Sequence, residues 1–284
     1  MKTDFFKPTD MNEAIALLDQ YQEKAAIVNG GSDIVEKLVA GSKNPEAIIY
    51  IADIEELKKI TLRDGNIVIG GAVTYVQMLT APTIQKVNGM MEAVGKLGSP
   101  AIRQVATPAG NIGTGAPSAD CTTMLMGLEA KVVVANAAGE RIIPIEEFFV
   151  TTYKTVLQPN DLIKEIYFAA PKEGDGSGYI RLARRKSQDI AKVLVSSYLS
   201  VKDGVCTKAV IGLGALNATA VRGTSIEEGI MGKKKEDALL YVRENFPKEA
   251  GLRASRFTHY KEIVTCTAVE RAVEMAWNHA EEAN

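Results

Sequence analysis

Residues 25–51, which read AAIVNGGSDIVEKLVAGSKNPEAIIYI, contain the pattern that decides the fold. The apolar run at 25–29 favours a buried strand, and the glycine pair at 30–31 permits a tight turn. Residues 32–41 have helical spacing, and a second apolar run at 47–51 suits another strand. A strand, a glycine turn, a helix and a strand in this order predict a right-handed βαβ unit, with its turn at the carboxyl end of the first strand.

The helix of this unit has recognisable end signals. Ser32 is the expected N-cap, Asp33 and Glu36 are spaced as in a capping box, and Gly41 would end the helix. Main-chain N–H groups are exposed where a strand turns into a helix, and the helix dipole favours negative charge at that end. The turn is therefore a candidate anion site.

Further regular elements surround this unit. An amphipathic helix is predicted at 12–21 and a strand at 66–72. A helical stretch is predicted at 74–97, because Thr74 and Gln77 are spaced as a capped helix start.

The segment 106–120, ATPAGNIGTGAPSAD, consists mostly of Gly, Ala, Pro and Ser. This composition predicts a loop that cannot form a helix, and so long a loop inside a compact domain is usually functional. A short helix is expected at 121–129. Two apolar runs that flank Asn136–Gly139 predict a β-hairpin.

The second half of the chain has a different order of elements. The segment 162–168 alternates as a strand does, and the polar, glycine-rich segment 171–178 is the expected domain junction. Three further alternating segments predict an antiparallel sheet, at 179–186, 192–202 and 205–216. From Thr224 the pattern becomes helical, and it ends in a long helix at 257–282.

The predicted fold class is therefore α+β. A length of 284 residues favours about two domains. We expect a first domain at 1–172, with a small βαβ part at about 1–55 and a mixed part at 56–172. A C-terminal domain is expected at 177–284, in which a small antiparallel sheet precedes a group of helices.

The composition excludes several classes of protein. With 46% hydrophobic and 24% charged residues and a net charge of -2, neither a disordered chain nor a nucleic-acid-binding protein is expected. No stretch reaches the roughly 18 apolar residues of a membrane span, and residues 1–14 lack the apolar run of a signal peptide. We therefore expect a cytoplasmic protein.

The cysteines and histidines argue against a metal site. Cys121, Cys206 and Cys266 form no CxxC motif, so neither a disulfide framework nor a cysteine-ligated zinc or iron–sulfur site is expected. Only two histidines occur, His259 and His279, so a His-rich metal centre is excluded.

Two glycine loops are the candidates for binding. A dinucleotide's pyrophosphate needs main-chain N–H donors at close range, and glycine leaves that approach open. The loops 27–34 and 107–120 have this character. The first is neither a GxGxxG fingerprint nor a GxxxxGK[ST] motif, which disfavours a nicotinamide-binding Rossmann domain and an ATPase.

Six blocks along the chain resemble, in the same order, the FAD-binding subunit of the xanthine dehydrogenase and carbon monoxide dehydrogenase family of molybdenum hydroxylases. They span nearly the whole chain: VNGGSDIVEKLVAG (28–41), GAVTYVQM (71–78), SPAIRQVATPAGNIGTGAPSADC (99–121), ERIIPIEEFF (140–149), RLARRKSQDIAKV (181–193) and LRASRFTHYKEIVTCTAVERAVE (252–274).

The resemblance implies a set of cofactor-binding residues and no catalytic residue. The two loops would hold the FAD pyrophosphate and the neighbouring riboses through Ile27, Val28, Asn29, Gly30, Gly31, Ser32, Asp33, Ile34, Thr107, Pro108, Ala109, Gly110 and Asn111. Asp120 would bond a hydroxyl or the adenosine side of FAD, and Gly98, Ile163 and Arg181 would line the site.

The sequence departs from the family pattern at three places. The usual A-G-G-T-D appears as N-G-G-S-D at 29–33, T-I-G-G-N appears as T-P-A-G-N at 107–111, and a usual lysine is Arg181. Pro108 removes an N–H donor and Ala109 adds a Cβ where phosphate would approach, so FAD affinity is expected to be reduced.

The function implied by the resemblance is electron transfer. Electrons from a molybdopterin-binding large subunit would reach this FAD through a [2Fe-2S] small subunit and pass to an acceptor, which is expected to be NAD. Two alternatives stay open. One is a stand-alone FAD-dependent oxidoreductase with its own substrate pocket, and the other is a scaffold subunit that has lost FAD.

A basic run near the expected domain junction has no assigned role. Arg181, Arg184, Arg185 and Lys186 lie in a segment with strand alternation, which would point them to both faces of the sheet. A solvated edge explains this run as well as an anion site does.

Overall fold

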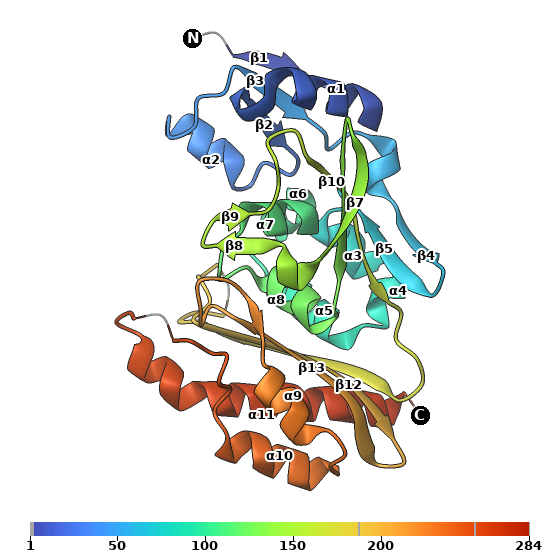
Figure 1. Cartoon of the computed structure of the whole chain (residues 1–284), viewed down its shortest axis with the longest axis vertical. Helices are drawn as coiled ribbons and strands as arrows, with labels where there is room; N and C mark the ends of the chain where they lie inside the picture. The colour runs from blue at the N-terminus through green and yellow to red at the C-terminus, as the bar shows by residue number, and fades with distance from the viewer. Residues whose placement is uncertain (1–2, 187, 253, 284) are drawn as a thin grey trace.

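The computed structural model describes residues 3–186, 188–252 and 254–283. Three sheets follow one another along the long axis of the molecule in Figure 1, with the N-terminal sheet at the top and the C-terminal sheet and its helices at the bottom. Buried apolar side chains form three clusters, and the largest joins the middle sheet to one face of the C-terminal sheet. The predicted α+β fold class is confirmed.

The N-terminal sheet is parallel and has the order β1-β3-β2, with bounds Asp4–Phe6 for β1, Ala25–Val28 for β2 and Ala47–Tyr50 for β3. The helices of this part are α1 (Met11–Tyr21), the 3-10 turn η1 (Gln22–Lys24) and α2 (Ile34–Val39). Because α2 connects the parallel strands β2 and β3, the predicted βαβ unit is confirmed.

The predicted capping of α2 by Ser32 is wrong. The helix begins at Ile34, and the residue before it, Asp33, makes no side-chain cap bond. The Asp33 carboxylate instead pairs with Lys37 at 2.6 Å. No residue of α2 is buried, so this helix lies on the surface.

The middle sheet is antiparallel and has the order β4-β5-β10-β6-β7. Its strands are β4 (Ile60–Arg63), β5 (Asn66–Gly70), β6 (Lys131–Asn136), β7 (Gly139–Pro144) and β10 (Leu162–Ala169), and the predicted hairpin is formed by β6 and β7. The connecting pieces are the 3-10 turns η2 (Glu55–Lys58) and η3 (Ile145–Glu147) and the small hairpin of β8 (Phe149–Thr151) and β9 (Lys154–Thr155).

The helical stretch predicted at 74–97 is three helices, α3 (Tyr75–Thr80), α4 (Pro82–Gln85) and α5 (Asn88–Lys96). The capping box of Thr74 and Gln77 is confirmed. The break comes at Ala81, whose extended backbone is what a residue before proline prefers. A further helix, α6 (Pro100–Val105), follows.

The prediction that 106–120 cannot form a helix is wrong, because most of this segment is α7 (Pro108–Thr114) and the start of α8 (Asp120–Gly127). The Thr107 hydroxyl accepts from the Gly110 amide at 3.0 Å, and Pro108 occupies the first helical position, where its missing N–H costs nothing. These local start signals outweigh the low helix propensity of the glycines.

The C-terminal sheet has the order β11-β12-β13-β14. Its elements are β11 (Asp175–Leu182), β12 (Val193–Lys202), β13 (Val205–Gly214) and β14 (Val221–Arg222), followed by α9 (Thr224–Ile230), α10 (Lys235–Glu244) and α11 (Thr258–Glu282). The three predicted strands and the predicted long helix are thus present. In Figure 1 the sheet lies between α8 above and α11 below, so that β12 is buried on both faces.

The second half of the glycine-rich segment 171–178, predicted to be a junction, is the start of strand β11. A Cβ at Gly176 would overlap the main chain of Ala276 and Ala280, and one at Gly178 would overlap the carbonyl oxygen of Ala272. The alanines lie four residues apart on one face of α11. These glycines therefore let the long helix rest directly on the strand.

The opposite face of this sheet is held to α8 in the same way. The Ser196 hydroxyl donates to the Thr123 carbonyl oxygen at 2.6 Å, and a Cβ at Gly212 would lie 2.6 Å from that same oxygen. Because α8 begins at Asp120, this packing fixes the start of α8 against the C-terminal sheet.

We expect Gly178→Ala to lower the free energy of unfolding by about 2–3 kcal/mol, because the added Cβ must push α11 away from β11. Gly95→Ala in α5 is the matched control: its Cβ meets no heavy atom within 4 Å, and it should stabilise by about 0.5–1 kcal/mol. Denaturant unfolding of both variants tests this. Equal stabilities would contradict the glycine contact.

Asp161 links neighbouring parts of the middle sheet. Its buried carboxylate accepts a hydrogen bond from Asn136 at 2.9 Å and forms an ion pair with Arg141. Burial alone would raise the pKa of Asp161, but hydrogen bonds from Arg141, the Gln158 amide and Asn136 outweigh it and lower the pKa below its usual value.

Asp161→Asn is expected to cost about 1–2 kcal/mol of stability at pH 7, a modest value because the Arg141 side chain is 38% exposed. A carboxyl whose pKa is lowered by folding stabilises above its unfolded pKa of about 3.9 and loses that effect as pH falls through the folded pKa. The difference in free energy of unfolding between wild type and variant should therefore shrink below about pH 4. A gap that stays constant from pH 7 to pH 3 would contradict this role.

Candidate functional site

The two glycine loops meet through Asn29. Its amide nitrogen donates to the Thr107 hydroxyl at 3.0 Å and to the Gly71 carbonyl oxygen at 2.7 Å. A Cβ at Gly30 would overlap the Val105 carbonyl oxygen, so the first loop lies directly against the chain that leads into the second. A second link joins Thr114, at the end of α7, to the Asp33 carboxylate at 3.4 Å.

Several main-chain donors are unused where the loops meet. Among the described residues, none accepts a hydrogen bond from the amides of Gly30, Gly31, Ser32 or Asp33. The turn is possible because Gly31 has a φ of +74°, in the left-handed region that favours glycine. Unpaired N–H groups need a polar partner, so this turn can bind an anion through its main chain.

Two side-chain oxygens beside these amides also lack partners. The Oδ1 atoms of Asn29 and Asn111 are buried and accept no hydrogen bond within the described part of the chain. The Asn29 amide orientation is fixed, because the Gly71 carbonyl can only accept. The unpaired amides can donate to phosphate oxygens, and the two unpaired amide oxygens can accept from hydroxyl groups. The turn therefore suits a ligand that carries both kinds of group.

The departures at Pro108 and Ala109 do not obstruct the second loop. Pro108 starts α7 at a position whose N–H would be unused by the helix. Ala109 is 5% exposed, and its side chain belongs to the apolar core of the middle part. Its Cβ therefore packs inward, which removes one of the two expected reasons for weaker FAD binding. The other reason remains, because Pro108 supplies no N–H donor at the start of α7.

A second glycine pair takes part in the site and was missed in the sequence. Gly71 accepts from Asn29, and a Cβ there would overlap the carbonyl oxygen of Ile163. Ile163 in turn lies beside α7, with its Cδ1 atom 3.7 Å from the place of a Cβ on Gly113. The repeat of IVNGG (27–31) as IVIGG (67–71) was the signal that could have revealed Gly71.

Asp120 and Arg181 form a second group of predicted residues. The Asp120 Oδ1 atom accepts from the Arg181 Nε at 2.7 Å and from the Tyr179 hydroxyl at 2.9 Å. Burial raises the pKa of Asp120 above its usual value, although Arg181 and Tyr179 oppose the rise. Arg181 is thus the internal partner of this carboxylate, which corrects the solvated edge expected for it.

The rest of the basic run lies outside the strand. β11 ends at Leu182, and Arg184, Arg185 and Lys186 are exposed in the turn that follows. The expected alternation of these side chains across a sheet is therefore wrong.

The remaining predicted residues differ in burial and in hydrogen bonding. Gly98, with a φ of +54°, precedes α6, and its carbonyl accepts from Arg103. α6 leads from it to Val105, which lies against Gly30. Val28 is buried, Ile27 and Ile34 are partly buried, and the Ser32 side chain makes no hydrogen bond to the described residues.

Over the described residues, no group of three or more acidic, histidine or cysteine side chains could hold a metal ion. Nor does any described helix have the length and apolar character that a membrane crossing requires.

Burial raises the pKa of the Cys121 thiol to about 12 and that of Cys206 to about 11.

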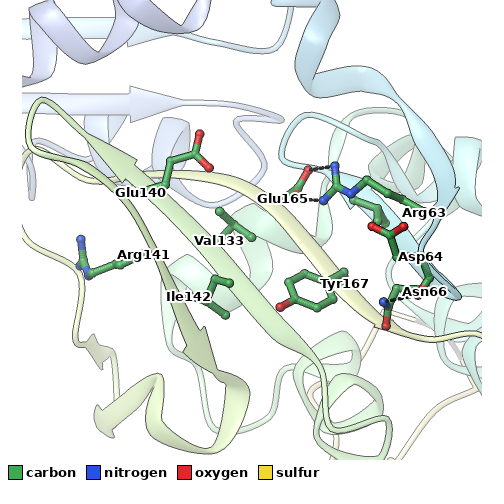
Figure 2. A pocket seen from close by; sticks show the side chains of 10 residues that line it. Arg63, Asp64, Asn66, Val133, Glu140, Arg141, Ile142, Glu165 and Tyr167 are labelled. Atoms are coloured by element: carbon green, nitrogen blue, oxygen red, sulfur yellow. Dashed lines mark hydrogen bonds and ion pairs between the residues drawn. The ribbon is translucent and has the colours of Figure 1, made fainter.

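A groove of about 530 Å³ lies on the middle sheet, as Figure 2 shows. Half of the residues that line it are charged, and Arg63 and Glu165 pair with each other at one side. None of the predicted cofactor-binding residues lines this groove. It is therefore separate from the meeting point of the glycine loops.

Comparison with family models gives two matches. The model described as "FAD binding domain in molybdopterin dehydrogenase" matches residues 1–171, and "CO dehydrogenase flavoprotein C-terminal domain" matches residues 178–276. The first match alone covers more than half of the chain and includes both glycine loops.

Curated relatives agree with these matches. The nicotinate dehydrogenase FAD-subunit of Eubacterium barkeri is 29% identical, over 81% of this chain and 79% of its own. The carbon monoxide dehydrogenase medium chain of Hydrogenophaga pseudoflava is 28% identical over 96% of both chains.

Among solved structures, carbon monoxide dehydrogenase from Hydrogenophaga pseudoflava, in a form lacking the Mo-pyranopterin moiety, matches with a TM-score of 0.89 and 26% identity over 98% of both chains. Quinoline 2-oxidoreductase from Pseudomonas putida 86 has the same fold, with a TM-score of 0.88 at 21% identity. The resemblance drawn from the sequence is confirmed: the chain belongs to the FAD-binding family of the molybdopterin dehydrogenases, together with the FAD subunits of carbon monoxide, xanthine and nicotinate dehydrogenases.

Proposed function

We propose that this chain binds FAD where the two glycine loops meet and serves as the electron-transferring subunit of a heteromeric molybdenum hydroxylase. The observation that carries the proposal is the contact of Asn29 and Gly30 with residues 105–107, which gathers unpaired main-chain donors in one place. A diphosphate is the part of FAD that such donors fit.

Each group of residues has a task in this proposal. The amides of residues 30–33 hold the diphosphate from one side, and Thr107–Asn111 supply the other wall. The open Oδ1 atoms of Asn29 and Asn111 accept from hydroxyl groups of the ribose or ribityl chain. Ile163 gives an apolar wall, and Asp120, held by Arg181 and Tyr179, faces the adenosine side.

The chain itself needs to supply no acid or base. FAD, when bound, can take up electrons singly and release them as a pair, so that the protein has to bind it, orient it and exclude water. Burial raises the pKa values of Tyr75, Tyr179 and Cys121 well above neutral, so these groups keep their protons and do not act as bases.

The remaining expectations form part of the same proposal. A molybdopterin-binding large subunit and a [2Fe-2S] small subunit would be the partners, NAD the acceptor, and the cytoplasm the location. The chain would divide into a cofactor-binding domain at 1–172 and a C-terminal domain at 177–284. A stand-alone oxidoreductase and a scaffold without FAD are the alternatives, and the FAD titration below separates the proposal from the scaffold.

The chain purified with added FAD should be yellow, with absorption bands near about 370 and 450 nm. Gly30→Ala should weaken FAD binding at least about tenfold, because its Cβ drives the two loops apart. Asn29→Ala, a milder change, removes the bridge to Thr107 and should also weaken binding. Fluorescence titration with FAD measures these dissociation constants.

Gly95→Ala serves as the control, since it adds a methyl group to α5 without meeting any neighbour. A colourless wild-type chain after incubation with FAD would favour the scaffold alternative. Identical FAD affinities for wild type, Gly30→Ala and Asn29→Ala would place the cofactor elsewhere.

The proposed acceptor has a separate test. Because an electron carrier that serves NAD works in both directions, anaerobic NADH should bleach the 450 nm band of the FAD-loaded chain. Loss of this absorbance within minutes supports NAD as acceptor. Full retention of the band with NADH, together with bleaching by dithionite, would rule NAD out while leaving FAD binding intact.

A further inference from the structure

A short segment of the C-terminal sheet, residues 215–222, holds the first half of the chain by hydrogen bonds, and we call it the strap. The Ala215 amide donates to the Pro117 carbonyl oxygen at 2.8 Å, and the Thr152 hydroxyl donates to the Ala218 carbonyl oxygen at 3.0 Å. Pro117 lies between α7 and α8, and Thr152 lies in the turn between β8 and β9. The strap therefore reaches from the C-terminal sheet to two segments that follow or adjoin α7.

Arg222 adds a third attachment, by charge. Its Nη1 atom lies 2.9 Å from a carboxylate oxygen of Glu129 and 3.0 Å from one of Glu146. Its Nε and Nη2 atoms donate to Glu227 of α9, at 3.0 Å and 2.6 Å. One guanidinium is thus fixed on the second half of the chain and reaches two carboxylates of the first half, which the forked shape of arginine permits.

Two residues at these attachments have a strained main chain. Ala215 and Glu129 have φ values of +61° and +50°, in the left-handed region that favours glycine. Glu129 also follows the C-terminal end of α8, where the helix dipole disfavours a negative charge. Their partners hold both residues in place: the Ala215 carbonyl accepts from Lys261 at 2.5 Å, and Glu129 pairs with Lys208 at 2.5 Å. Tertiary contacts, and not local preference, therefore determine these two residues.

The segments that the strap holds belong to one side of the candidate cofactor site. Gly115, the residue after α7, accepts from the Tyr153 amide of the β8–β9 hairpin at 2.8 Å. Thr114, the last residue of α7, donates to the Asp33 carboxylate of the first glycine loop at 3.4 Å. The strap thus holds the hairpin, the hairpin holds the end of α7, and α7 carries the second glycine loop.

We infer that the strap is a conformational device that keeps this side of the candidate cofactor site closed. While the strap is attached, the hairpin and the end of α7 stay in place, and when it detaches they open together. FAD bound between the two glycine loops then leaves through the open form. This last step rests on the proposed function, whereas the hold of the strap on the hairpin does not.

Hydrogen exchange of single amides, followed by NMR, tests this hold. Thr152→Val removes the hydroxyl that bonds Ala218 and keeps the shape of the side chain. The Ala215 and Tyr153 amides should then exchange about threefold to tenfold faster, because exchange follows the open population and one hydrogen bond is lost. Thr152→Ser keeps the hydroxyl and is the matched control, with exchange as in wild type. Wild-type exchange in Thr152→Val would overturn the inference.

Two substitutions of Glu129 separate this hold from general stability. Glu129→Gly removes the ion pairs and the strained side chain together, so the Ala215 and Tyr153 amides should exchange at least about threefold faster at an unchanged or higher melting temperature. Glu129→Gln keeps the strain, so the same amides should exchange faster at a lower melting temperature. The Ile51 amide, bonded to Val28 at 2.9 Å, is the reference. An equal acceleration at Ile51 would mean unfolding of the whole chain and would refute the strap.

Release of FAD gives the second readout. From a chain loaded with FAD, Thr152→Val and Glu129→Gly should release the flavin faster by the same factor as their amides exchange, which the fluorescence of free flavin measures. If exchange becomes faster but release does not, control of FAD by the strap is refuted while its hold on the hairpin stands. If no FAD binds to wild type, the proposed function fails, and the exchange experiment still judges the strap.

Discussion

Main chain rests directly on main chain at the decisive contacts of this protein, and only glycine permits so close an approach. Gly30 lies against the Val105 carbonyl and Gly71 against the Ile163 carbonyl. Gly178 lies against the Ala272 carbonyl of α11 in the same way. The first contact sets the two glycine loops against each other, the second lies next to them at Gly71, and the third fixes the C-terminal sheet on its helix. The candidate site and the scaffold therefore depend on one physical constraint.

The middle of the chain connects these contacts. α7 closes the second glycine loop, and α8 begins with Asp120 and packs on the C-terminal sheet through Thr123. Arg181 of that sheet returns to Asp120. Predicted site residues from both halves of the chain are therefore in contact, and each half matches a family model of its own.

Sequence patterns predicted those elements whose signals are local. The βαβ unit, the hairpin around Asn136–Gly139 and the long C-terminal helix follow from apolar periodicity and turn residues, and the structure confirms all three. The glycine- and proline-rich composition of 106–120 predicts a loop, whereas the structure has a helix at 108–114. The start signals of Thr107 and Pro108 decide the outcome there.

Other features could not be predicted because they depend on distant partners. The glycines of 171–178 look like those of a linker until α11, about a hundred residues later, is placed on them. Asn29 could be named as a loop residue, but its bridge to Thr107 joins positions 78 residues apart. The burial of Arg181 against Asp120 is likewise a tertiary effect, which strand alternation alone predicted wrongly.

A crystal structure of the chain with FAD bound is the strongest test of whether the diphosphate binds where the two glycine loops meet. The diphosphate oxygens are expected within about 2.7–3.2 Å of the amides of residues 30–33, with Thr107–Asn111 on the other side of the cofactor. A dinucleotide seated elsewhere, for example in the groove lined by Arg63 and Tyr167, would contradict the account if those amides then face only solvent.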